Sequence, residues 1–176
     1  MKNLRNAVDE KEHIVMKSLL EDHIFVGCID RSLALIQHTT KLYLVNIANL
    51  SKELFYQIII FNFGSFGYMR LTCPAPLYQL AMLSLETEQT GWTQSDGPKN
   101  ELAQFVVELL KSKAEMLLDY FSIEIDDDGN LLTLPLLLSK YSPDLNRLPM
   151  FVLRLATDVS NLFLVLSKSR DLVHSL

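Results

Sequence analysis

Residues 25–45 read FVGCIDRSLALIQHTTKLYLV, and this stretch decides the fold class of the chain. It contains three short segments rich in β-branched, leucine and aromatic side chains, which are Phe25–Ile29, Ser32–Gln37 and Lys41–Val45. Two brief polar intervals, Asp30-Arg31 and His38-Thr39-Thr40, separate them. Intervals of this length are typical of tight turns between antiparallel strands. The sequence therefore predicts a three-stranded antiparallel meander, with Leu42 and Leu44 on one face of the last strand.

Helices are predicted on both sides of this meander, because apolar residues recur there three or four positions apart. The predicted helices are Glu10–Asp22, a helix capped by Asn49 or Ser51 that runs to Phe63, Leu77–Leu85, and a long helix after Pro98 that continues to Phe121. Strands beside helices of this kind predict an α+β fold, in which a short antiparallel sheet packs with helices.

Further strands are predicted in the second half of the chain. Tyr68–Leu71 has strand composition, and the alternating residues on both sides of the acidic turn at Asp126–Asn130 are typical of a hairpin. Phe151–Leu155 is another candidate strand, since it is short, apolar and preceded by Pro149.

Composition narrows the classes of function. The chain has 176 residues, a formal net charge of −5 and 49% apolar residues. The acidic balance argues against broad binding to a phosphate backbone, so contact with DNA is expected only indirectly. No apolar stretch approaches the ~20 residues of a spanning helix, so no membrane segment is expected. The apolar surplus fits either a large core or a surface that expects a partner.

Motifs for metal or cofactor chemistry are missing from the sequence. The four histidines are not spaced as zinc ligands, and Asp126–Gly129 departs from a calcium loop because its glycine comes too early and Leu137 stands where the last glutamate would fall. The sequence predicts no metal site, no cofactor and no enzyme. Cys28 and Cys73 are expected to be reduced, buried thiols of a cytosolic or nuclear protein.

A collinear series of motifs over residues 10–159 resembles the C-terminal domain of the eukaryotic MutL homologue 1 family. The motifs are Phe25–Cys28, Ala34–Leu44, Glu53–Ile58, Arg70–Leu71, Pro74–Leu77, Gly91–Thr93, Asp96–Lys99, Lys113–Leu117, Gly129–Leu131, Leu134–Leu138 and Leu153–Thr157. Their order and spacing match along the whole range, which makes the resemblance highly specific.

The resemblance implies a nuclear, non-catalytic dimerisation domain of a DNA mismatch repair protein. In the family this domain pairs with a second MutL-type subunit, of Pms or Mlh type, and is thought to dock short peptide motifs of factors such as a repair exonuclease. The family's ATPase domain lies far upstream and is not part of this sequence. Gln37 and Met69 match positions near the partner surface and are the predicted partner-binding residues. The alternative is that Gln37 only ends a strand and Met69 fills the core.

The resemblance also bears on catalysis. The family's endonuclease belongs to the partner subunit, whose metal motif has the form Asp-Gln-His-Ala. In this chain Ile36 takes the place of the aspartate before Gln37-His38, and Thr40–Tyr43 supply no carboxylate. A two-metal phosphodiesterase needs clustered anionic oxygens, so His38 is predicted to be structural. A metal-dependent nuclease that uses His38 is the less favoured alternative.

The resemblance stops after Val159, and this boundary predicts three parts. Residues 1–9 are expected to be a disordered segment, residues 10–159 an incomplete dimerisation domain, and residues 160–176 a divergent tail. The break suggests a splice variant or a gene model that runs past an exon boundary, and a truncated form defective in partner binding is an alternative. Leu162, Val165 and Leu166 are the tail residues that could cap an exposed core.

Overall fold

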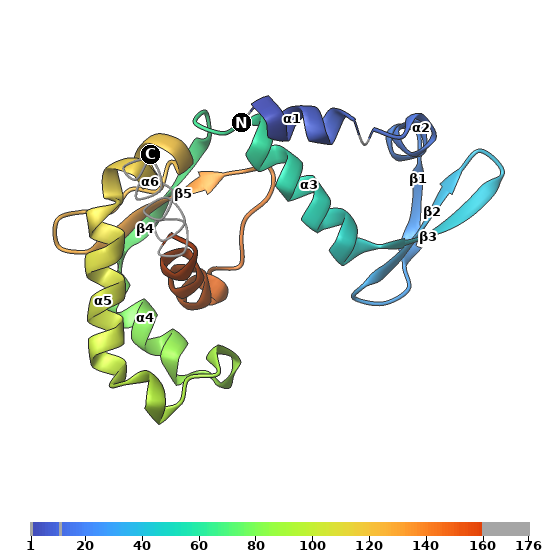
Figure 1. Cartoon of the computed structure of the whole chain (residues 1–176). Helices are drawn as coiled ribbons and strands as arrows, with labels where there is room; N and C mark the ends of the chain where they lie inside the picture. Colours follow the sequence, from blue (N-terminus) through green and yellow to red (C-terminus); the bar gives the residue numbers. More distant parts are fainter. Residues whose placement is uncertain (1, 11, 160–176) are drawn as a thin grey trace, which may run out of the picture. The chain divides into compact units, whose positions relative to one another are not determined.

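The computed structural model describes residues 2–10 and 12–159 and divides into two compact units (Figure 1). The first unit ends at Phe63 and the second begins at Gly64. The predicted tail, with Leu162, Val165 and Leu166, lies outside the described residues.

The first unit combines helices with a three-stranded sheet. Its elements are α1 (Lys2–Asp9), α2 (Ile14–Glu21), β1 (Ile24–Cys28), β2 (Leu33–His38), β3 (Lys41–Asn46) and α3 (Ile47–Phe61). The strands pair antiparallel in the order β1-β2-β3, which confirms the predicted meander. Both turns are held locally, since the Asp30 carboxylate accepts hydrogen bonds from the Ser32 and Leu33 amides and Thr39 adopts a left-handed conformation with φ 55°.

Residues 2–9 differ from the predicted disordered segment, because they form α1. The Arg5 guanidinium donates from Nε to the Ile60 carbonyl at 3.3 Å and from Nη2 to the Phe61 carbonyl at 2.9 Å. These carbonyls belong to the last turn of α3, where four acceptors lack partners inside the helix. A hydrogen bond between residues 55 positions apart therefore joins α1 to α3. Composition alone does not predict such a long-range contact.

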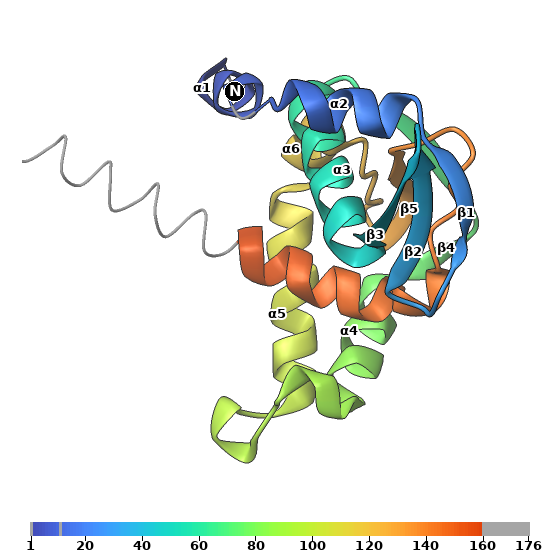
Figure 2. The same cartoon turned by 90° about the vertical axis from the view of Figure 1, so that its right-hand side faces the viewer.

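The second unit contains the larger core. Its elements are β4 (Gly67–Pro76), α4 (Leu77–Glu86), α5 (Lys99–Ser112), α6 (Ala114–Phe121), β5 (Asn130–Leu136), the 3-10 turns η1 (Glu88–Thr90), η2 (Gln94–Asp96) and η3 (Leu145–Arg147), and helical residues 148–159. β4 and β5 pair antiparallel, and α4 and α5 lie side by side (Figure 1, Figure 2). The largest fully buried aliphatic side chains come from several of these elements and are Leu77, Leu110, Leu117, Leu131 and Val152. The α+β class is thus confirmed.

Two local predictions for this unit are corrected by the structure. The predicted strand at Phe151–Leu155 is wrong, because these residues lie within helix 148–159. Buried Leu148, Val152 and Ala156 recur every fourth residue and give that helix its apolar stripe. The long helix after Pro98 breaks at Lys113 into α5 and α6.

The cysteine prediction is wrong in its burial part, because Cys28 and Cys73 are free thiols, as expected, but both are exposed. Each lies on a strand that pairs on one side with a single neighbour, β1 with β2 and β4 with β5. Strands at the margin of a small sheet leave side chains accessible even where the sequence is apolar.

We expect Gly129→Ala to destabilise the second unit by about 2–3 kcal/mol, more than Gly91→Ala. Both glycines have positive φ, 82° and 65°, and so share the backbone penalty. A Cβ at Gly129 would lie 3.1 Å from Val107 Cγ1, whereas one at Gly91 meets nothing within 4 Å. Urea unfolding of the two variants measures the difference, and equal losses would contradict the packing argument.

Candidate functional site

One face of the three-stranded sheet is apolar and accessible. Side chains directly opposite one another in an antiparallel pair share a face, and successive residues alternate between faces. Ile24, Gln37 and Leu42 form one row across the three strands, and Leu35 and Leu44 lie opposite each other in the next row. We call this surface the open face. Its members are Ile24, Leu33, Leu35, Gln37, Leu42, Leu44 and Asn46.

The two faces of the sheet differ in burial along β2 and β3, although Phe25 of the edge strand β1, on the opposite face, is also 59% exposed. On the opposite face, Ala34 and Ile36 of β2 are each 5% exposed. On the open face, Ile24, Leu42 and Leu44 are 63%, 62% and 59% exposed. No member of the open face carries a charge. An exposed apolar surface of this kind is a candidate site of interaction.

Sequence reasoning identified only part of the open face. The alternation in β3 correctly placed Leu42 and Leu44 together, but it did not show which face the helices leave uncovered. Ile24 was not singled out, and the signal that could have found it is its cross-strand position beside Gln37. That position follows from the meander register rather than from any motif.

Gln37 lies in the centre of a row of the open face, between two exposed aliphatic side chains. Its Nε2 donates to the Thr39 carbonyl at 3.1 Å, which joins the side chain to the β2–β3 turn. His38 lies on the opposite face, in register with Lys41 at the end of the hairpin. Within the described residues, no three His, Cys, Asp or Glu side chains come together in a possible metal site.

Met69 is a residue of the second unit, so the structure places the two predicted partner residues in different units. Met69 lies in β4 opposite Leu134, and it packs against the hydrophobic core while remaining partly accessible. The alternative that Met69 fills the core therefore holds for part of its side chain, and the rest of that side chain is accessible.

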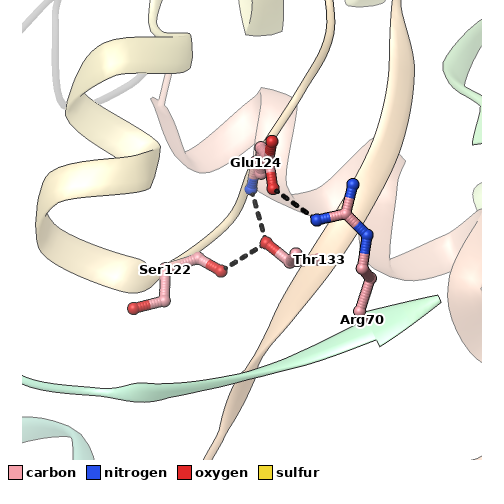
Figure 3. A network of polar contacts seen from close by, with 4 residues as sticks. All are labelled: Arg70, Ser122, Glu124 and Thr133. Carbon is pink, nitrogen blue, oxygen red and sulfur yellow. Dashed lines mark hydrogen bonds and ion pairs between the residues drawn. The ribbon is translucent and has the colours of Figure 1, made fainter.

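A polar network fixes the strand that carries Met69 (Figure 3). The Thr133 hydroxyl, in β5, donates to the Ser122 carbonyl at 2.8 Å and accepts from the Glu124 amide at 2.9 Å. Glu124 Oε2 lies 3.7 Å from Nη1 of Arg70, the residue after Met69. Thr133 is 2% exposed, so its hydroxyl joins the α6–β5 connection to the sheet from inside the unit.

The acidic turn at Asp126–Asn130 is closed by its own amides. The Asp126 carboxylate accepts from Asn130 Nδ2 at 2.9 Å and from the Asn130 backbone amide at 2.7 Å. These side-chain and backbone hydrogen bonds hold the pKa of Asp126 below its ordinary value. The turn is capped as expected, but the predicted hairpin is only partly formed, because Ile125 makes an isolated bridge to Leu131 and β5 pairs with β4.

A groove in the second unit is the other candidate site. Its volume is about 860 Å³, and it is lined by α4 and by residues of the chain from η3 onwards. Leu83, Phe151 and Leu155 supply apolar surface, while Arg147 and Arg154 supply positive charge and Asp158 supplies a negative one. The groove can therefore hold a short segment that combines apolar and polar groups.

A family model for the C-terminus of DNA mismatch repair protein Mlh1 matches residues 1–161. The chain belongs to this family. DNA mismatch repair protein Mlh1 of Dictyostelium discoideum is 42% identical over 159 residues, which are 90% of this chain and 18% of that protein. The Mlh1 protein of Saccharomyces cerevisiae is 32% identical over 169 residues, 90% of this chain and 21% of that protein.

Membership of the Mlh1 C-terminus family confirms the resemblance seen in the motifs. The chain is a domain of a MutL-family DNA mismatch repair protein, and it spans 18% of the length of the Dictyostelium relative and 21% of the yeast one. No helix in the described part of the chain is long and apolar enough to cross a membrane.

We expect Thr133→Val to lower the free energy of unfolding of this Mlh1-family domain by about 1–3 kcal/mol. The change is nearly isosteric, but it leaves the partly buried Glu124 amide and Ser122 carbonyl without the hydroxyl that joins them. Thr157→Val is the matched control, because that hydroxyl donates to Leu153 at an exposed site. Chemical denaturation followed by far-UV circular dichroism checks this, and similar losses in both variants would refute it.

Proposed function

We propose that this chain is a non-catalytic interaction domain that pairs with a second MutL-type subunit, of Pms or Mlh type, in the nucleus. The observation that carries the proposal is the open face of β1-β2-β3, an uncharged aliphatic surface in a domain of the Mlh1 C-terminus family. Gln37 contacts the partner from the middle of this face. Met69 contacts it through the accessible part of its side chain.

Burial of the open face contributes to the driving force for association. Complete burial of an exposed aliphatic side chain contributes about 1.5–3 kcal/mol. Ile24, Leu42 and Leu44 each retain roughly three fifths of their exposure, so covering them contributes about 1–2 kcal/mol apiece. A stable interface covers about 800 Å² on each partner, which is more than these three side chains provide. Leu33, Leu35 and Gln37 lie on the same face and enlarge the surface available for contact.

The proposed lack of catalysis rests on the residue that stands where a nuclease motif would need an aspartate. Ile36 lies on the buried face of β2, where the metal motif of the family's nuclease subunit carries an aspartate. His38 follows at the hairpin end without a carboxylate beside it in β2 or β3. DNA contact is accordingly proposed to be indirect, through the assembled complex.

We further propose that the groove beside helix 148–159 docks short peptide motifs of downstream repair factors, an exonuclease among them. The mixed lining of aliphatic, aromatic and arginine side chains suits a peptide with an apolar anchor and flanking polar groups. Anisotropy of a labelled exonuclease motif peptide tests this. Arg154→Glu should weaken peptide binding at least tenfold while leaving subunit pairing intact, whereas Lys140→Glu, outside the groove lining, should change neither.

We expect the double variant Leu42→Ser, Leu44→Ser to bind the C-terminal domain of a Pms-type subunit at least 30-fold more weakly than the wild type. Both leucines are already exposed, so the melting temperature of the isolated chain should change little. Leu118→Ser, at an exposed leucine of α6, is the control and should bind normally. Calorimetric titration measures the affinities, and undiminished binding by the double variant would exclude the open face.

A separate assay tests the proposed lack of catalysis. Supercoiled plasmid with manganese should remain intact in the presence of the chain alone. Nicking that disappears in His38→Ala would instead support the metal-dependent nuclease. Failure of the wild-type chain to bind the partner domain at micromolar concentration would support the binding-defective alternative.

A further inference from the structure

The groove beside helix 148–159 has a methionine in its lining. Met150 lies in the first turn of that helix and remains partly accessible. Among the methionines that the structure describes, Met69, Met82 and Met116 are also partly buried, but they pack against the hydrophobic core, which does not include Met150. The sulfur of Met150 therefore has a different environment from theirs, at the wall of a groove rather than at the edge of the core.

Ser84 of α4 also lines the groove, although the residue is 0% exposed. Its hydroxyl donates to Met150 Sδ at 3.9 Å, and within the described residues this is the only hydrogen bond of that hydroxyl. A thioether sulfur is a weak acceptor. Buried polar groups in folded proteins normally have stronger partners, so an acceptor oxygen on this sulfur would improve the hydrogen bonding of Ser84.

Oxidation of Met150 creates such an acceptor, and hydrogen peroxide is a suitable oxidant. The sulfur lone pair attacks one peroxide oxygen, the O–O bond breaks as the S–O bond forms, and the proton of the transferred hydroxyl passes to the departing hydroxide, which leaves as water. Methionine is oxidised by two electrons to its sulfoxide, and the peroxide is reduced. The new oxygen is bonded to the atom that the Ser84 hydroxyl already faces, so it can accept that hydrogen bond without a rearrangement of α4.

The same oxidation changes the surface that a docked peptide would cover. Leu83, Phe151 and Leu155 give the groove its apolar lining, and the flexible thioether of Met150 has the same character. A sulfoxide is polar, so an apolar anchor that covers it has to displace water. Burial of a polar group without full hydrogen bonding is unfavourable. Oxidation therefore opposes docking, while Ser84 limits the cost of the sulfoxide to the fold.

We propose that Met150 is a reversible oxidation site, and that its sulfoxide, held by the Ser84 hydroxyl, weakens docking in the groove. The regulatory part rests on the proposed function, since it concerns the groove in which a peptide motif of a repair factor is proposed to dock. The modifying agent is a peroxide, and methionine sulfoxide reductases of the two epimer specificities catalyse the reverse step.

The test exposes the full chain to hydrogen peroxide and measures the sulfoxide at each methionine by peptide mass spectrometry. Met150→Leu removes the sulfur and keeps a similar apolar volume. Met16→Leu is the matched control, because Met16 is 52% exposed in α2 and lies outside the groove lining. Anisotropy of the labelled exonuclease motif peptide measures docking before oxidation, after oxidation and after treatment with the reductases.

We expect peroxide to oxidise Met16 and Met150 about fivefold faster than the three methionines that pack against the core. Oxidation should weaken peptide binding about fivefold in the wild type and in Met16→Leu, and the reductases should restore it. Met150→Leu should bind the peptide equally well before and after peroxide. Protection of Met150 as strong as that of the core methionines overturns the inference, and so does a loss of affinity that persists in Met150→Leu.

The role of Ser84 is measured with Ser84→Ala, which removes the donor without adding a polar group. Oxidation should lower the melting temperature of Ser84→Ala by about 3 °C more than that of the wild type, because the sulfoxide oxygen then lacks its donor. An equal shift in the two proteins overturns the role of the hydroxyl.

The two proposals fail in distinguishable ways. A reduced wild type that does not bind the peptide removes the docking function and with it the regulation, while the mass spectra and melting temperatures still decide whether Met150 is an oxidation site. A reduced wild type that binds the peptide, beside a chain oxidised at Met150 that binds equally well, removes only the regulation.

Discussion

The register of β2 is the constraint on which the first unit depends. Ala34 and Ile36 are covered on one face, while Leu35 and Gln37 lie on the other. Because side chains alternate along a strand, a slip of one residue would exchange the two faces. The register is held at both ends, by the Asp30 carboxylate on the Ser32 and Leu33 amides and by the tight turn at Thr39.

The two units differ in how much of their apolar surface they bury. The second unit surrounds its core with helices and strands and satisfies buried polar groups internally, as Thr133 does between Glu124 and Ser122. The first unit has few buried side chains among its described residues, and much of its aliphatic surface remains on the open face. Part of the apolar surplus in the composition thus lies on the open face, and other exposed apolar side chains, such as Ile14 and Phe105, lie elsewhere in both units.

Local patterns explain why some elements were predictable. The meander and α4 follow from short-range periodicity and turn chemistry, and their observed bounds lie within one or two residues of the predicted ones. Phe151–Leu155 was misassigned because a short apolar run has no period that separates strand from buried helix. The helix α1 depends on Arg5 reaching carbonyls of α3, a long-range contact that no local pattern encodes.

The candidate site was also only partly predictable from the sequence. Alternation showed that Leu42 and Leu44 share a face, but their exposure depends on where the helices pack. The motif resemblance pointed to Gln37 and Met69 without distinguishing them. Only the tertiary arrangement separates a side chain in the middle of an accessible face from one that packs partly into a core.

The geometry of β1 favours packing through the open face over extension of the sheet at its edge. β1 is an edge strand with exposed Phe25 and Val26, and such strands can pair with another chain. Its register shifts between Phe25 and Gly27, however, and a bulge disturbs the regular row of donors and acceptors that an added strand would need. The flat, uncharged row from Ile24 to Leu42 has no such interruption. Pairing by that face would leave selectivity to shape and to the polar side chains of Gln37 and Asn46, because no member of the face carries a charge.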